Sequence, residues 1–216
     1  MNKPNSYVYK TLTDSEVIAY KEKILDLLAI YYENPEEVFE MINSERIAFA
    51  AFNGNDLAGL YTVKHKSLNE KILLAYLGLL LLHPDHGKAL MNLVSAHKAI
   101  LNKQVSKTIY FYSLTSNPVV HKIASKFYAN VYPRTLDSDE MTIPKYYDEI
   151  ISHTGYNICS SNAYKVINSP SVARYNMKYR QQLVSTYRNS RNSISRLYDL
   201  DQERGDRILI VGSYNN

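Results

Sequence analysis

The chain has 216 residues, of which 45% are hydrophobic and 21% are charged, a composition typical of one ordinary globular domain. Its single cysteine excludes an internal disulfide framework and favours a reducing compartment. Neither a cleavable leader nor a long apolar run is visible, so we expect a cytoplasmic protein without a membrane span.

The formal net charge is only +4, but the charge is unevenly distributed. Segment 165–198 carries seven basic residues and no acidic one. This asymmetry indicates either an acidic partner or a solvated helix face.

The first quarter of the chain predicts a strand followed by two helices. Residues Tyr7–Leu12 alternate as a strand does. Thr13 and Glu16 have the spacing of a capping box, and the helix that follows should run to about Tyr32. Pro35 then stands at the first position of a second, shorter helix, where its missing amide costs nothing.

A hairpin and a long apolar strand come next. Residues 46–52 and 57–64 have strand composition and are separated by Asn-Gly-Asn-Asp, a strong hairpin signal. The run Ile72–Leu82 is almost entirely apolar, which is typical of a strand buried on both faces. Residues 83–87 (His-Pro-Asp-His-Gly) turn this strand into a helix with apolar residues at helical spacing as far as residue 100. The first amides of such a helix have no partner of their own, and they form a natural seat for a phosphate or pyrophosphate.

The strand and helix pattern then repeats once. We expect a strand over residues 108–114, a helix over 119–131 that starts at Asn117 and Pro118, and a stop at Tyr132 and Pro133. In the last 80 or so residues we expect a helix near 145–153, a loop from 157 to 170, a basic helix over about 172–198 and a strand over 207–211. The order predicts a mixed α/β sheet with helices on its faces.

This order, with a glycine-bearing helix start after the central strand and Asn117 with Pro118 after the next, resembles the Gcn5-related N-acetyltransferase (GNAT) superfamily. The resemblance implies a GNAT-like, mostly antiparallel twisted sheet flanked by helices. We expect a single domain, with an acyltransferase-like core over 1–133 and a family-specific helical elaboration over 134–216 whose final strand returns to the sheet. The C-terminal motifs resemble a GNAT-like group without an assigned function.

The resemblance also implies an N-acyltransferase that uses acetyl-CoA or another acyl-CoA as donor and an amine as acceptor. In that family the pantetheine pairs with the backbone of the central strand. The pyrophosphate lies on a loop with the sequence pattern Gln or Arg, any two residues, Gly, any one residue, and Gly or Ala. Carried onto this sequence, the cofactor contacts are Leu81, Leu82, Asp85, His86, Gly87, Lys88, Ala89 and Asn117. The basic residue that opens the loop is absent, because Pro84 or Leu82 stands there. The amides of residues 86–89 and the Lys88 ammonium are left to compensate.

Two residues are the candidates for proton transfer. Many relatives carry a tyrosine seven residues after the asparagine, which is Ala124 here, and Tyr128 lies one turn further along the same expected helix. The alternative is that Tyr128 only packs. His83, at the end of the central strand, is the candidate base. It could pair with His86 on a metal, but no third ligand has suitable spacing, so we expect no metal.

Three other functions compete with acyl transfer from CoA. The missing loop residue and the displaced tyrosine favour a catalytically degenerate GNAT-like binding or scaffold protein. The basic segment 165–198 suits an acidic acyl carrier protein as donor, and its interleaved arginines and tyrosines are a weaker signal for nucleic acid, which we do not expect. Glycine-rich dinucleotide and Walker loops and a Gly-x-Ser-x-Gly elbow are all missing from the sequence. Their absence disfavours a dinucleotide oxidoreductase, a nucleotide kinase and an α/β-hydrolase.

Overall fold

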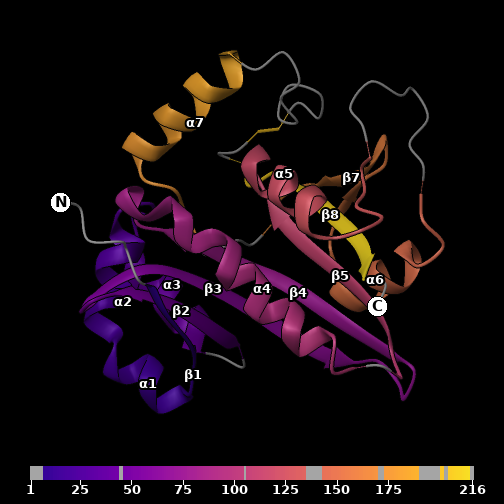
Figure 1. Cartoon of the computed structure of the whole chain (residues 1–216). Coiled ribbons are helices and arrows are strands. Elements are labelled where there is room, and N and C mark those ends of the chain that lie inside the picture. Colours follow the sequence, from indigo (N-terminus) through magenta and orange to yellow (C-terminus); the bar gives the residue numbers. More distant parts are fainter. Residues whose placement is uncertain are drawn as a thin grey trace. The chain divides into compact units, whose positions relative to one another are not determined.

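A computed structural model describes residues 7–43, 46–104, 106–134, 143–169, 173–189, 200–201 and 204–214 (Figure 1). They divide into two units. The first contains the described parts of 1–64, 77–105 and 172–179, and the second those of 65–76, 106–171 and 180–216. The expectation of one domain with a core over 1–133 remains a prediction.

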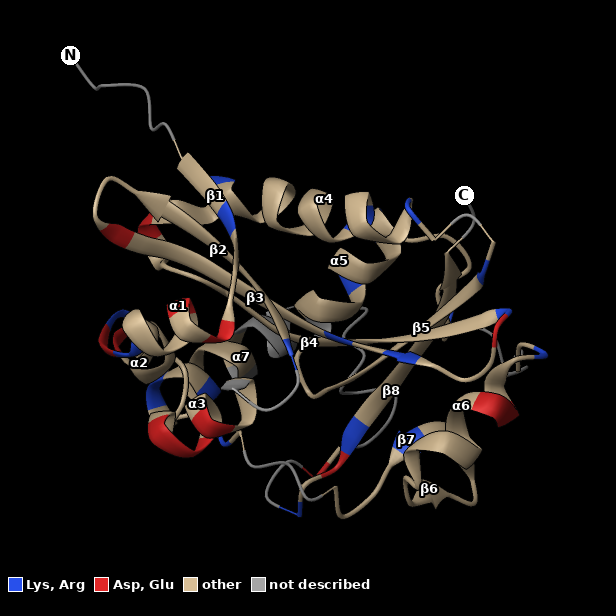
Figure 2. Ribbon diagram, turned by 90° about the horizontal axis from the view of Figure 1, so that it is seen from below, with Lys and Arg blue, Asp and Glu red and all other residues tan. Residues whose placement is uncertain are grey.

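The first unit is a sheet with helices on both faces. Its strands, in sheet order, are β1 (Tyr7–Leu12), β2 (Ile47–Asn53), most of β3 (Asp56–Ser67) and the second half of β4 (Ile72–Leu82). Its helices are α1 (Asp14–Ala19), α2 (Lys21–Ala29), α3 (Pro35–Asn43) and α4 (Leu90–Leu101). Helices α1 to α3 cover one face and α4 the other (Figure 2).

The strand predicted over Ile72–Leu82 and the hairpin before it are both confirmed. β2 and β3 pair antiparallel and turn at Asn53 and Asp56. Gly54 has φ 61°, in the left-handed region that glycine adopts without strain. The local sequence signal therefore determined this turn.

The first predicted helix is interrupted. The capping box is confirmed, because the Thr13 hydroxyl accepts from the Glu16 amide at 3.3 Å and the Glu16 carboxylate accepts from the Thr13 amide at 2.9 Å. The single helix to Tyr32 is wrong, since the backbone leaves helical geometry at Tyr20 (φ −96°, ψ 12°) and α2 starts afresh. The break lets the Tyr20 ring pack against Phe52 of β2, with ring centroids 4.9 Å apart.

The capping box allows a direct test of helix energetics. We expect Thr13→Ala to lower the free energy of unfolding by about 1 kcal/mol, because the first turn of α1 loses its side-chain acceptor. Urea unfolding followed by circular dichroism measures this loss. Ile18→Ala, an exposed change in the same helix and outside the cap, is the control and should change the value by less than about 0.5 kcal/mol. Equal effects of the two variants would contradict the role of the cap.

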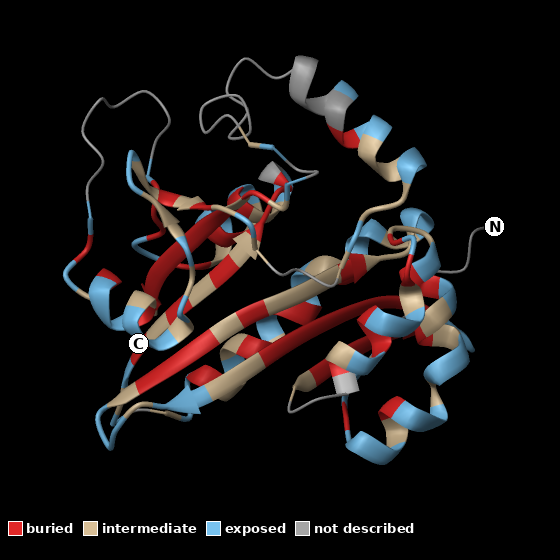
Figure 3. Cartoon of the chain, turned by 180° about the vertical axis from the view of Figure 1, so that it is seen from behind, coloured by how far each residue is buried: buried red, intermediate tan, exposed pale blue. Residues whose placement is uncertain are grey.

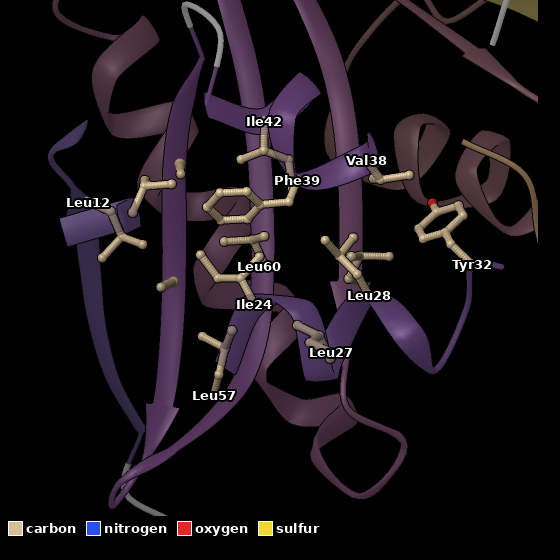
Figure 4. Packing of buried hydrophobic residues seen from close by; sticks show 14 of the residues in the cluster. Leu12, Ile24, Leu27, Leu28, Tyr32, Val38, Phe39, Ile42, Leu57 and Leu60 are labelled. Atoms are coloured by element: carbon tan, nitrogen blue, oxygen red, sulfur yellow. The ribbon is translucent and has the colours of Figure 1, made fainter. Parts of the chain in front are cut away.

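Two apolar cores lie on the two faces of the first unit's sheet. The core beneath α1 to α3 contains Ile24, Leu28, Val38, Phe39 and Leu60 (Figure 4). The core beneath α4 contains Phe49, Ala51, Ala58, Tyr61, Val63 and Leu93. Buried residues follow the strands, and exposed residues follow the outer faces of the helices (Figure 3). The alternation of side chains along β2 and β3 thus fills both cores.

The second unit contains the remaining strands. Their order is the first half of β4, then β5 (Thr108–Thr115), β8 (Arg207–Tyr214), β7 (Asn162–Val166) and β6 (Ile158–Cys159). β4 and β5 run parallel, whereas β5 with β8, β8 with β7 and β7 with β6 are antiparallel. Its helices are α5 (Pro118–Phe127) and α6 (Tyr147–Thr154), and α7 (Met177–Asn189) passes from the first unit into the second. The predicted return of the last strand to the sheet is confirmed.

Two expectations for this unit are wrong. The expected loop 157–170 contains the hairpin of β6 and β7, whose strands are only two and five residues long and which is held by pairing of β7 with β8. The helix after Asn117 ends at Phe127 instead of residue 131, because Tyr128 is extended (φ −121°, ψ 150°). Of the expected basic helix, residues 172 and 190–198 lie outside the described residues.

None of the helices in the described ranges has the length and hydrophobicity that crossing a membrane requires.

Candidate functional site

The second half of β4 is the edge strand of the first unit's sheet. The His83 amide donates to the Ala58 carbonyl of β3 at 2.9 Å. Because backbone groups of successive strand residues point in opposite directions, Leu80 and Leu82 direct their amides and carbonyls away from β3. The paired register of β4 with β5 covers residues 72–76 and 108–112. This edge can therefore pair with an extended ligand.

The edge carbonyl of Leu82 is engaged by a tyrosine that the sequence analysis did not single out. The Tyr31 hydroxyl, which follows α2, donates to the Leu82 carbonyl. Burial raises the pKa of Tyr31 to about 12, with a further contribution from Tyr179, so the hydroxyl keeps its proton at neutral pH. The rings of Tyr31 and Tyr179 meet edge to face, with centroids 4.8 Å apart. Tyr31 thus joins the end of β4 to the first turn of α7.

The turn after β4 is tighter than expected. Residues Pro84–Ala89 form 3₁₀ turns with a kink at His86 (φ −125°, ψ 32°), and α4 begins only at Leu90. The Asp85 amide donates to Nδ1 of His83 at 3.4 Å, and the His86 amide donates to the His83 carbonyl at 2.8 Å. The expectation that the His86 amide is free for a phosphate is therefore wrong, because the turn uses it internally. The Lys88 side chain is exposed, and no atom lies within 4 Å of the place where a Gly87 Cβ would be.

The two histidines of the turn lie close together. The ring centroids of His83 and His86 are 5.4 Å apart, and Nδ1 of His86 lies 3.3 Å from the Tyr7 hydroxyl of β1. Nδ1 of His83 also lies 3.7 Å from the Asp85 carboxylate. The amide of Asp85 favours the His83 tautomer with its proton on Nε2, whereas the carboxylate favours a proton on Nδ1 and leaves Nε2 as an acceptor.

A cavity of about 310 Å³ opens beside His83. It is lined by Lys23, Asp26 and Leu27 of α2, by Asp56 and Leu57 of β3, and by His83 itself. Asn55 of the hairpin completes the lining, and Lys23 Nζ donates to its side-chain oxygen at 2.9 Å. The cavity lies wholly within the first unit.

The other predicted cofactor residues of the first unit have distinct positions. Leu81 is buried in the core beneath α1 to α3, while Leu82 packs against the core beneath α4. Ala89 is buried in that second core and closes the turn. The predicted cofactor residues of the first unit therefore all lie at the end of β4 or in the turn that follows it.

Asn117 and Tyr128 lie in the second unit, at opposite ends of the ten-residue helix α5. Asn117 is the N-cap, and its side chain accepts from the Val119 amide at 3.0 Å. Tyr128 is the buried C-cap, with its ring 4.7 Å from that of Phe111. A helix of this length spans about 15 Å, so the two side chains are not brought together.

No side chains of His, Cys, Asp or Glu gather in threes as a metal site among the residues that the structure describes. Tyr31, Tyr7, Asp26 and Asp56 were missed by sequence reasoning. No local sequence pattern could have identified these residues, because their contacts join elements that are far apart in the sequence.

Comparison with known proteins gives structural similarity only. No family model and no curated protein matches the chain. Among solved structures, a GNAT family acetyltransferase from Elizabethkingia anophelis with acetyl-CoA bound is 11% identical and has a TM-score of 0.46, covering 98% of this chain and 99% of that one. An IAA acetyltransferase from Bacillus cereus is also 11% identical with a TM-score of 0.46, covering 96% and 99%. A probable N-acyltransferase from Enterococcus faecalis is 16% identical with a TM-score of 0.42, covering 54% of this chain, and the chain spans 31% of that protein's length.

These identities and TM-scores are too low to transfer an activity or a substrate to this chain. The fold rests on the chain's own topology. Its order of a strand, helices, a hairpin, a long strand with its helix, and one further strand with its helix is the predicted one. With a parallel pair of β4 and β5 beside antiparallel pairs of β1 with β2, β2 with β3 and β5 with β8, the described residues form the mixed α/β fold that the sequence predicts.

Proposed function

We propose that the protein is an acyl-CoA-dependent N-acyltransferase, transferring an acetyl or other acyl group to an amine by direct attack. The observation that carries the proposal is the edge of β4, where the amide and carbonyl of Leu80 and the amide of Leu82 point away from β3 and the strand runs directly into a turn with an exposed lysine. A chain of amides such as pantetheine can pair with a strand edge as an added strand. The edge and the turn therefore suit a donor with amides at one end and phosphates at the other.

Lys88 is the phosphate contact in this proposal. The amides of Asp85 and His86 are used within the turn, so the exposed ammonium of Lys88 has to supply the attraction for the pyrophosphate. The Asp85 carboxylate, 3.7 Å from Nδ1 of His83, is a partner for that ring.

His83 and Tyr128 keep the roles proposed for them. The amine nitrogen attacks the carbonyl carbon of the acyl-CoA thioester. The C–N bond forms and the C–S bond breaks. His83 is the proposed base that takes the proton of the amine. The role of Tyr128 as donor of a proton to the departing sulfur is a separate proposal, because Tyr128 lies in the second unit.

A catalytically degenerate GNAT-like binding protein is the second candidate. It is favoured by the internally bonded turn, which offers fewer free amides than a phosphate loop needs. An acidic carrier protein as donor is a variant of the first candidate. The described basic residues Arg174, Lys178 and Arg180 lie in the segment that would receive it.

The first test is a calorimetric titration with CoA, acetyl-CoA and a long-chain acyl-CoA. We expect at least one of them to bind with a dissociation constant in the micromolar range, and Lys88→Ala to weaken that binding about 10-fold, because a charge-assisted contact to phosphate is lost. Lys103→Ala removes an equally exposed charge beyond the end of α4 and should leave binding unchanged. Failure of all three compounds to bind would reject CoA as the donor and favour the second candidate or a carrier protein.

A further inference from the structure

The side chain of Arg46 reaches across neighbouring strands of the first unit's sheet. Arg46 immediately precedes β2, and its guanidinium lies beside Thr62 of β3 and against Gly78 of β4. A Cβ on Gly78 would lie 2.7 Å from Nη1 of Arg46 and 2.6 Å from the Thr62 hydroxyl oxygen. Both distances are well below van der Waals contact. Only a residue without a side chain therefore fits against this guanidinium.

The pair of Arg46 and Gly78 is costly in two ways. Glycine weakens the interior of a strand, and its presence there often marks a close approach by a ligand or by another part of the backbone. A buried guanidinium is costly as well, because its charge loses hydration, and Nη1 of Arg46 is fully buried. Both costs fall at the same point of β4, which indicates that a cation at this point has a use in function.

Gly78 stands where the edge of β4 is no longer paired with β5. The register of the two strands covers pairs as far as Tyr76 with Tyr112. Beyond it Gly78, Leu79 and Leu80 are partly exposed, although they lie within a strand of eleven residues. The guanidinium therefore stands beside a part of the strand that solvent reaches.

The proposed donor reaches the same part of β4. With its amides at Leu80 and Leu82 and its phosphates at Lys88, its acyl end points towards Gly78. Two strand residues span about 7 Å, which is the reach of the short arm between the last amide and the thioester of acyl-CoA. Neighbouring strands lie about 4.8 Å apart, so a group over Gly78 is close to a ligand that pairs with the edge. Arg46, which is itself partly exposed, is within reach of such a ligand.

We infer that Arg46 binds a carboxylate of the substrate at the acyl end of the donor. The inference rests on the proposed function for the direction of the donor along β4, and it does not use the role proposed for His83. A guanidinium presents five N–H donors in a planar fork that matches a carboxylate. Arg46 can therefore bind a ligand in addition to the interaction that it has within the chain. The carboxylate belongs either to an amino acid as acceptor or to the acyl group of a dicarboxylic donor.

The test is a nuclear magnetic resonance titration of the full chain at pH 7 with pairs of compounds that differ in a carboxylate. Glycine, leucine and phenylalanine are each compared with their amides, which tests the acceptor. Succinyl-CoA is compared with butyryl-CoA, which tests the acyl group. In one of these arms we expect the carboxylate compound to bind at least 10-fold more tightly and to shift the side-chain Nε–H signal of Arg46, because the contact is charge-assisted. The amide signals of Gly78 and Leu79 should shift with it.

Two variants of Arg46 and a matched control locate the effect. Arg46→Gln should abolish the preference for the carboxylate compound. Arg46→Lys should retain part of it, because the charge remains while the planar fork is lost. Lys10→Gln, an exposed change on β1, removes the same charge and should leave the preference unchanged.

The outcomes separate this inference from the proposed function. Equal affinities within every pair, or a preference that survives Arg46→Gln, would overturn the inference. The comparison of the pairs on the natural chain decides the matter even if Arg46→Gln does not fold. The amino acid arm contains no CoA, so a carboxylate preference there without binding of any CoA compound would reject the proposed donor and support the role of Arg46. Binding of CoA compounds without a carboxylate preference in either arm would reject the role of Arg46 alone.

Discussion

Replacing Gly212 with alanine is expected to lower the free energy of unfolding by about 3 kcal/mol or more, because overpacking a closed core forces backbone and side chains apart. Gly212 of β8 stands directly opposite Phe111 of β5. A Cβ on Gly212 would lie 2.1 Å from the Phe111 ring, which is fully buried. The Phe111 ring therefore occupies the space that a side chain at residue 212 would need.

Urea unfolding of the single and double variants measures this effect. The double variant Gly212→Ala with Phe111→Leu should be more stable than Gly212→Ala alone, since the smaller side chain relieves the clash and the two changes are not additive. Gly87→Ala is the control, because nothing lies within 4 Å of the position of its Cβ. It should shift the free energy by less than about 0.5 kcal/mol. A stable Gly212→Ala variant would contradict the packing of β5 against β8.

Replacing Asp206 with asparagine is expected to cost about 3 kcal/mol at pH 7, because it breaks a buried ion pair and leaves its cation without a counter-charge. The fully buried Asp206 carboxylate accepts from Arg204 at 2.7 Å and lies 3.1 Å from Lys165 Nζ. Lys165 is itself mostly buried, with 12% of its side chain exposed. The three side chains join the start of β8 to β7.

The effect should depend on pH with a definite sign. Burial by itself raises the pKa of Asp206, but hydrogen bonds from Arg204 and Lys165 outweigh it and hold the pKa at about 2. The pKa of an aspartate in the unfolded chain is about 3.9. Because the folded value is the lower one, the stabilisation of roughly 2 to 3 kcal/mol is complete above the unfolded pKa and is lost as the pH falls towards 2.

The difference between the natural chain and Asp206→Asn should therefore fall to roughly half at pH 3. Urea unfolding at pH 7 and pH 3 gives the two values. Asp148→Asn, an exposed change on α6, is the control and should give a small difference at both pH values. If the Asp206→Asn difference were the same at pH 3 and pH 7, the ion pair would not be its source.

The sequence by itself determined the elements whose signals are local. The capping box at Thr13, the turn at Gly54 and the strand Ile72–Leu82 were all predicted within a residue or two, because hydrogen bonds and backbone freedom within a few residues decide them. The order of these elements was enough to predict a mixed α/β sheet.

Only the tertiary structure decided the features that depend on distant partners. The hairpin of β6 and β7 forms because β8 pairs with β7, and the helix break at Tyr20 accompanies ring packing against Phe52. Likewise the extended backbone at Tyr128 follows the end of α5 and the contact with Phe111. Local propensity is a weak force beside such packing, so it could not predict these departures.

The residues of the candidate site also differ in whether the sequence alone could identify them. His83 and Lys88 could be named from the sequence because they stand at the end of an evident strand and in the turn that follows it. The hydroxyl of Tyr31 on the Leu82 carbonyl, and the meeting of Asp26 with Asp56 around one cavity, join residues 30 or more positions apart. Folding alone brings such residues together, because no periodicity or spacing along the chain encodes which loop end faces which helix.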